Sequence, residues 1–225
     1  AISLSGTFKG GLSGFDANMS LITEQGNATF NGNLSMAQDT TYDAYVSIND
    51  FNIGSLLNQD SVLGYISASA KVQGRGLNPK NMVANVQGDL SQLQAMGYDY
   101  HDIKLDLSAN QGDLEGSLIS PDPNVQLNMD FHADMREQYP KLFATLNVDT
   151  INLKNLNLIE DNFRYQGKIV AELETADLDF LNGSLVISNS SIAYNDDRFT
   201  LDSIALIASA DTSRNSLILE SGLLN

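Results

Sequence analysis

The two histidines have the widest chemical repertoire of any residues in this chain. His101 lies between the polar positions of two expected strands, and His132 lies on the polar parity of another. A zinc site built on paired imidazoles would need these two separate positions to meet by coincidence of the fold. A solvated or hydrogen-bonded role is therefore favoured for both, and no metal ligand is expected.

Nucleophiles and phosphate-binding loops give equally little support for catalysis. The chain has no cysteine, which removes thiolate chemistry, and Gly11-Leu-Ser-Gly14 lacks the spacing of a nucleophile elbow. Gly74-Arg-Gly76 is too short to hold a phosphate and is expected to form a tight turn. The sequence thus predicts no catalytic residues and no cofactor.

The acidic residues set limits on the partners. Asp177-x-Asp179 and Asn195-Asp196-Asp197 could ligate calcium, but neither has the twelve-residue loop with a closing glutamate, so solvated turns are favoured. Asp and Glu total 28 against 12 Lys and Arg, a formal charge of −16. Such a field repels nucleic acid and anionic head groups, whereas contact with acyl chains is unaffected.

Alternating apolar residues are the main structural signal, since side chains of a strand point to opposite faces with period two. The pattern recurs at residues 15–21, 42–48, 66–72, 103–109, 125–131, 142–148, 169–173 and 204–210. About a dozen strands are expected, paired as antiparallel meanders. One common face should carry Val46, Ile48, Ile66, Val72, Leu105, Leu127, Leu146 and Ile169.

Turn residues separate these stretches. Turns are expected at Asn31-Gly32, Gln111-Gly112-Asp113, Pro121-Asp122-Pro123-Asn124, Asn182-Gly183 and Asn195-Asp196-Asp197. Helical periodicity is nearly absent. Short helical corners are expected at residues 54–58 and 154–159, too short to cover a sheet.

An internal repeat of about 100 residues is indicated by the similarity of residues 46–56 to residues 146–156. The expected organisation is the end of a preceding repeat at 1–40, one unit at 41–140 and an incomplete unit at 141–225, all in one continuous domain. Both ends stop within the alternating pattern, so the chain is expected to be part of a longer protein. Tandem units of this kind indicate an elongated, stacked architecture.

The apolar parity of these strands must be buried against a second layer, closed into a barrel, or offered to a ligand. A β-sandwich with an ordinary core is one hypothesis, a closed barrel is another, and an open curved sheet that holds hydrocarbon is the third. For the open sheet, the candidate lipid-facing residues are Met19, Leu21, Ile48, Ile66, Ile103, Leu105, Leu127, Met129, Val148 and Leu206.

Eight short motifs of strands and turns follow one another along almost the whole chain. They are Phe8-Lys-Gly-Gly11, Asp50-Phe-Asn-Ile-Gly-Ser-Leu-Leu57, Leu63-Gly-Tyr-Ile-Ser-Ala68, Gly97-Tyr-Asp-Tyr-His-Asp-Ile103, Asp113-Leu-Glu-Gly-Ser-Leu118, Ser120-Pro-Asp-Pro-Asn124, Ile151-Asn-Leu-Lys-Asn-Leu-Asn-Leu158 and Asn182-Gly-Ser184. In this order and spacing, they resemble the large AsmA-like proteins of Bacteroides-type bacteria, and the TamB family most closely.

This resemblance implies a segment of an inner-membrane-anchored periplasmic protein whose antiparallel sheet curls into an open groove with an apolar lining. The implied function is to hold phospholipid acyl chains and pass them between the inner and outer membranes. The alternative implied function is a scaffold for outer-membrane protein assembly, with a barrel partner contacted through other parts of the full-length protein. Neither function is enzymatic, and neither involves nucleic acid.

Overall fold

The computed structural model describes residues 2–11, 13–36, 39–176, 181–210 and 215–222. The described chain is all-β, with a single five-residue helix, as the alternating pattern predicts. It divides into two compact units, Ala1–Gln111 (unit 1) and Gly112–Asn225 (unit 2). The acidic pair Asp177 and Asp179, considered above as calcium ligands, lies outside the described residues.

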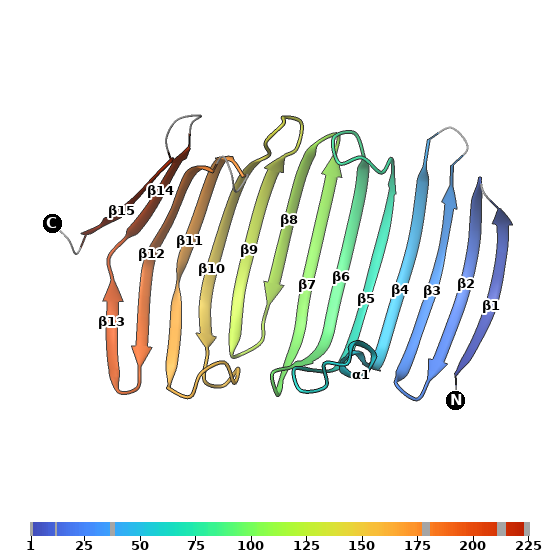
Figure 1. Cartoon of the computed structure of the whole chain (residues 1–225), viewed down its shortest axis with the longest axis horizontal. Coiled ribbons are helices and arrows are strands. Elements are labelled where there is room, and N and C mark those ends of the chain that lie inside the picture. Colours follow the sequence, from blue (N-terminus) through green and yellow to red (C-terminus); the bar gives the residue numbers. More distant parts are fainter. Residues whose placement is uncertain (1, 12, 37–38, 177–180, 211–214, 223–225) are drawn as a thin grey trace. The chain divides into compact units, whose positions relative to one another are not determined.

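Unit 1 is an antiparallel meander in which each strand pairs with the next one in the chain (Figure 1). Its elements are β1 (Ser3–Gly11), β2 (Gly14–Thr23), β3 (Gly26–Ser35), β4 (Thr41–Asn52), α1 (Ile53–Leu57), β5 (Leu63–Arg75), β6 (Val83–Ala95) and β7 (Tyr98–Asn110).

Unit 2 is also built of antiparallel strands. They are β8 (Asp113–Ser120), β9 (Val125–Asp134), β10 (Lys141–Asn152), β11 (Phe163–Thr175), β12 (Asn182–Tyr194), β13 (Asp197–Leu201), β14 (Ile204–Ala210) and β15 (Asn215–Ser221). Strands β8 to β12 pair in chain order. Strands β13 and β14 pair with successive halves of one edge of β12, and β15 pairs with β14.

Neither unit is a sandwich. Among the described residues, every substantial contact between elements of one unit joins strands that are neighbours in its sheet, apart from the packing of α1 against β5. Few side chains are therefore fully buried, and most of those that are apolar are alanines, such as Ala17, Ala84 and Ala109. Short side chains become buried in a single layer because longer neighbours lean over them.

Three expected turns are confirmed, and the reason lies in the backbone angles. Gln111 and Gly112 have positive φ values of 53° and 90°, and Asn195, with a φ of 52°, opens the hairpin between β12 and β13. At the third, Asp122 Oδ1 accepts a hydrogen bond of 2.9 Å from the Asn124 backbone N–H. These are the left-handed and Asx conformations that Asn, Asp and Gly adopt at low cost.

Two expected turns are wrong, because the glycines serve packing instead. Gly32 lies inside β3, where a Cβ would come within 2.9 Å of both the Phe30 ring and Ala44 Cβ. Gly183 lies near the start of β12 beside a register shift, and a Cβ there would meet the Glu172 carbonyl oxygen. Glycine inside a strand often marks a close approach or a bulge of this kind. Gly74 and Arg75 likewise end β5, and only Gly76, with a φ of 73°, has a turn conformation.

An asparagine caps the corner at each copy of the 46–56 and 146–156 motif. Asn52 Oδ1 accepts a hydrogen bond from the Ser55 backbone N–H at 2.9 Å, and Asn152 Oδ1 accepts one from the Asn155 backbone N–H at 3.2 Å. The capped segment forms α1 in unit 1 and a series of turns in unit 2. The expected helix at 154–159 is therefore replaced by turns. The length and boundaries of the repeat stay a prediction.

The two corners differ in how their leucines pack. Leu156 is only 2% exposed, whereas Leu56 at the equivalent position of the motif is 65% exposed. The same backbone capping device thus tolerates two different arrangements of its apolar side chain.

Candidate functional site

In unit 1, the strand register gathers the apolar parity onto one side of the sheet. Residues that pair directly in antiparallel strands share a face. Met19 pairs with Phe30, Ala28 pairs with Ile48, and Leu90 pairs with Ile103. The resulting surface, termed the apolar face of unit 1, carries Phe15, Met19, Leu21, Phe30, Leu34, Val46, Ile48, Ile66, Val72, Val86, Leu90, Ile103, Leu105 and Leu107.

Unit 2 has an apolar face of its own, built by the same rule. Leu127 pairs with Val148, Met129 with Leu146, and Leu185 with Leu206. The apolar face of unit 2 carries Leu127, Met129, Phe131, Leu142, Leu146, Val148, Ile169, Leu173, Leu185, Ile187, Ile204 and Leu206.

The ten candidate lipid-facing residues are divided between these two faces. Six of them lie on the apolar face of unit 1: Met19, Leu21, Ile48, Ile66, Ile103 and Leu105. The other four lie on the apolar face of unit 2: Leu127, Met129, Val148 and Leu206. Within each unit, the register thus brings together every candidate that falls in it.

The side chains of both apolar faces are mostly half-buried, which is unusual for so much aliphatic surface. Of the ten candidates, Val148 is buried, with 4% of its area exposed, and the other nine are half-buried. Within a unit, no second sheet covers the described part of either face. Burial of apolar area releases about 25 cal/mol per Å². Each face can therefore gain free energy by accepting an apolar ligand.

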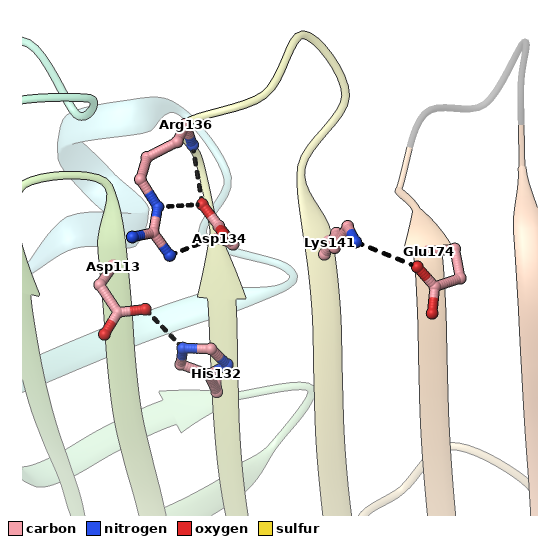
Figure 2. A network of polar contacts seen from close by, with 6 residues as sticks. All are labelled: Asp113, His132, Asp134, Arg136, Lys141 and Glu174. Carbon is pink, nitrogen blue, oxygen red and sulfur yellow. Dashed lines mark hydrogen bonds and ion pairs between the residues drawn. The ribbon is translucent and has the colours of Figure 1, made fainter.

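The opposite, polar face of unit 2 carries an ordered set of charged contacts near one end of β8 to β11 (Figure 2). Arg136 holds Asp134 through two side-chain hydrogen bonds, from Nε at 2.8 Å and from Nη2 at 2.7 Å. Lys141 Nζ lies 3.3 Å from Glu174 Oε2. These charged contacts thus lie on the side of the sheet opposite the apolar face, and that side also carries the exposed side chains of Ile119 and Phe143.

His132 is part of a cluster that sequence reasoning missed. Its Nε2 lies 2.5 Å from Asp113 Oδ1, and one ligand atom from each of Asp113, Glu115 and His132 lies within 4.8 Å of the others. The two histidines belong to different units, since His101 lies in β7 of unit 1. The signal in the sequence that could have indicated this cluster is Asp113-x-Glu115, two carboxylates on one face at the start of a strand. The hairpin that follows this strand brings His132 onto the neighbouring strand.

An open depression of about 310 Å³ lies in unit 1. Asp50, Tyr65, Gln92, Gln94 and Asp99 line it. It is wide open to solvent, and its lining includes no histidine. We assign it no chemistry.

The Asp134–Arg136 pair gives a testable pKa. The guanidinium hydrogen bonds of Arg136, followed by its backbone N–H bond, lower the pKa of Asp134 from 3.8 to about 2. Arg136→Gln should return this pKa toward 3.8, measured from the Asp134 carboxyl ¹³C shift against pH. Because the folded-state pKa lies below the unfolded value, the pair stabilises the fold above about pH 4, and this contribution is lost as the pH falls toward 2.

Lys141→Gln is the matched control for that titration, since the charge of Lys141 is the weakest influence on Asp134. It should shift the pKa of Asp134 far less than Arg136→Gln does. Equal shifts from the two variants would show that net charge, and not the hydrogen bonds, sets the value.

No family model, curated protein or solved structure matches this chain. Among the described residues, no helix has the length and hydropathy needed to cross a membrane. The support for the candidate site therefore comes from the geometry of the two apolar faces alone.

Proposed function

We propose that this chain is a non-catalytic segment of a periplasmic TamB/AsmA-like protein that holds phospholipid acyl chains against the apolar faces of its sheets. The observation that carries the proposal is the half-buried aliphatic surface that the register assembles in each unit without a covering layer.

Hydrocarbon fits such a surface better than polypeptide does. Interior strands have their backbone N–H and C=O groups paired with neighbouring strands, so a sheet face offers almost no hydrogen bonds. An extended peptide lying on the face would leave its own backbone groups unpaired, which costs free energy for each buried group. An acyl chain has no such groups, and each methylene that it buries contributes about 0.8 kcal/mol.

The charge of the chain supports contact with lipid tails over head groups. With a net charge of −16, the protein repels an anionic membrane surface, so recruitment by electrostatic attraction to head groups is unfavourable. In the proposed function, the sheet receives lipid by apolar contact alone. Transfer between the two membranes would then be performed by the longer protein of which this chain is a segment.

Lipid extraction tests the proposal directly. The 225-residue chain is produced in a bacterial periplasm, purified without detergent and extracted with organic solvent, and the extract is analysed by mass spectrometry. We expect phospholipids in a reproducible ratio to protein, and saturable binding of a fluorescent fatty acid that is competed by phospholipid.

An all-β protein of similar size with a closed core serves as the control. If this chain carries no more lipid than the control and does not bind the fatty acid, acyl-chain binding is wrong. Protein-assembly scaffolding, which predicts capture of unfolded outer-membrane proteins without bound lipid, would then be the better hypothesis.

A further inference from the structure

The cluster of Asp113, Glu115 and His132 has the donor set of a divalent-cation site. One oxygen from each carboxylate and a ring nitrogen of the imidazole all lie within 4.8 Å of one another. Imidazole nitrogen together with carboxylate oxygen is a ligand combination that Zn²⁺ accepts readily. Glu115 and His132 are exposed and Asp113 is half-buried, so an ion can reach all three from solvent.

The cluster is fixed by strand register and not by a loop. Glu115 of β8 pairs directly with His132 of β9, and Asp113 lies two positions before Glu115, on the same side of the same strand. Neighbouring side chains on a paired ladder keep their spacing because the backbone between them is hydrogen-bonded. The three ligands are therefore held on a rigid support.

The two cationic side chains drawn in Figure 2 form their hydrogen bonds or ion pairs with carboxylates other than Asp113 and Glu115. Arg136 gives its side-chain hydrogen bonds to Asp134, and Lys141 pairs with Glu174. The charge of Arg136 also acts on Asp113. Even so, two carboxylates face one imidazole with no lysine or arginine hydrogen-bonded to either of them in the described part of the chain.

Glu115 is the residue that a simple ion pair leaves unexplained. His132 already hydrogen-bonds Asp113, and within the part of unit 2 that the structure describes no hydrogen bond or ion pair reaches the carboxylate of Glu115. Two carboxylates this close repel one another, because like charges on neighbouring positions of a sheet are destabilising. A divalent cation between them would reverse the sign of that interaction.

We propose that Asp113, Glu115 and His132 bind one Zn²⁺ ion on the polar face of unit 2. In a tetrahedral site with bonds of about 2.1 Å, the ligand atoms are about 3.4 Å apart. The Asp113 and His132 side chains must therefore separate by about 1 Å from their hydrogen-bonded distance, which a small rotation of two exposed side chains allows. Water completes the coordination, and the ion ties β8 to β9.

Equilibrium dialysis of the whole 225-residue chain against Zn²⁺, after removal of metal with a chelator, tests the proposal. We expect saturable binding of one Zn²⁺ per chain. His132→Gln and Glu115→Gln should each weaken this binding by more than about tenfold, since loss even of an outer-shell partner of a metal commonly costs that much.

Two matched variants control for charge and for the second histidine. Asp130→Asn removes a neighbouring carboxylate of the same face, and His101→Gln removes the other imidazole of the chain. Both should bind Zn²⁺ as the unchanged chain does. Absence of one-to-one binding, or full binding by Glu115→Gln or His132→Gln, overturns the three-ligand site.

Proton NMR keeps the test decisive if a variant does not fold. The chain has two histidines, so His101→Gln assigns the ring signals of both. In the unchanged protein, Zn²⁺ should shift the His132 ring signals and leave those of His101 in place. Unshifted His132 signals at saturating Zn²⁺ would refute the site.

Discussion

Leu105→Asp and Leu127→Asp should each weaken acyl-chain binding to their own unit by more than about a hundredfold. Each side chain is half-buried on an apolar face, Leu105 in unit 1 and Leu127 in unit 2. A carboxylate there would have to lose its water to hydrocarbon, a cost well above the roughly 2.7 kcal/mol that a hundredfold loss represents. Titration with the fluorescent fatty acid measures the loss of affinity. In each variant, the unit without the substitution should still bind the fatty acid and serves as the internal reference.

Both variants are expected to fold. A single-layer sheet leaves each position open to solvent in the absence of ligand, so the new carboxylate can stay hydrated. Circular dichroism and urea unfolding check this. Unfolding of both variants would mean that the faces are closed off as a core, contrary to the proposed open surface, because an unpaired charge inside a core costs several kcal/mol.

Ser108→Asp and Asn128→Asp are the matched controls. Each adds one negative charge to the same strand as its test residue, β7 or β9, but on the exposed polar face. Lipid binding by these variants should equal that of the unchanged chain. Equal loss in test and control variants would mean that net charge governs binding and would remove the apolar faces as its cause.

Gly54→Ala should lower the free energy of unfolding by about 3 kcal/mol, the upper part of the range for overpacking. Gly54 is buried in α1, and a Cβ built there would overlap the Leu63 carbonyl oxygen and lie 2.8 Å from its carbonyl carbon. The obstacle is backbone, so no side-chain rotation can relieve it. The corner between β4 and β5 would have to open, which urea unfolding measures.

Gly88→Ala isolates this steric effect. A Cβ at Gly88 would lie 3.5 Å from Leu105 Cβ, an ordinary contact, within a regular strand. Because glycine costs about 0.5–1 kcal/mol relative to alanine inside a strand, this variant should be slightly more stable than the unchanged chain. If both glycine variants are equally stable, the packing of the corner does not limit stability.

The faces of the sheet were predictable from sequence because alternation is a local property. Once Val46 and Ile48 are on one parity of a strand, burial of one side fixes the register with the next strand, and the pairs Val46–Ala70 and Ile48–Ala68 follow. The all-β class and the short corner at 54–58 were likewise predictable, because both depend on residues that are close together in the sequence.

The details that escaped prediction depend on partners distant in sequence. Whether Gly32 is a turn or a packing position is decided by Phe30 and Ala44, and the latter lies on another strand. The meeting of Glu115 with His132 depends on where the hairpin between β8 and β9 sets its register. Bulges also move register, as between Ile48 and Phe51, and a one-residue shift exchanges the two faces of a strand.

The pairing of strands in chain order also governs how each unit acquires its structure. In unit 1, every strand forms its ladder with the strand made just before it, so contacts join residues that are close in sequence. Low contact order is associated with fast folding, since little loop-closure entropy must be lost before a contact forms. Each new strand can therefore add to the growing edge as the chain leaves the ribosome, with the preceding strand as its template.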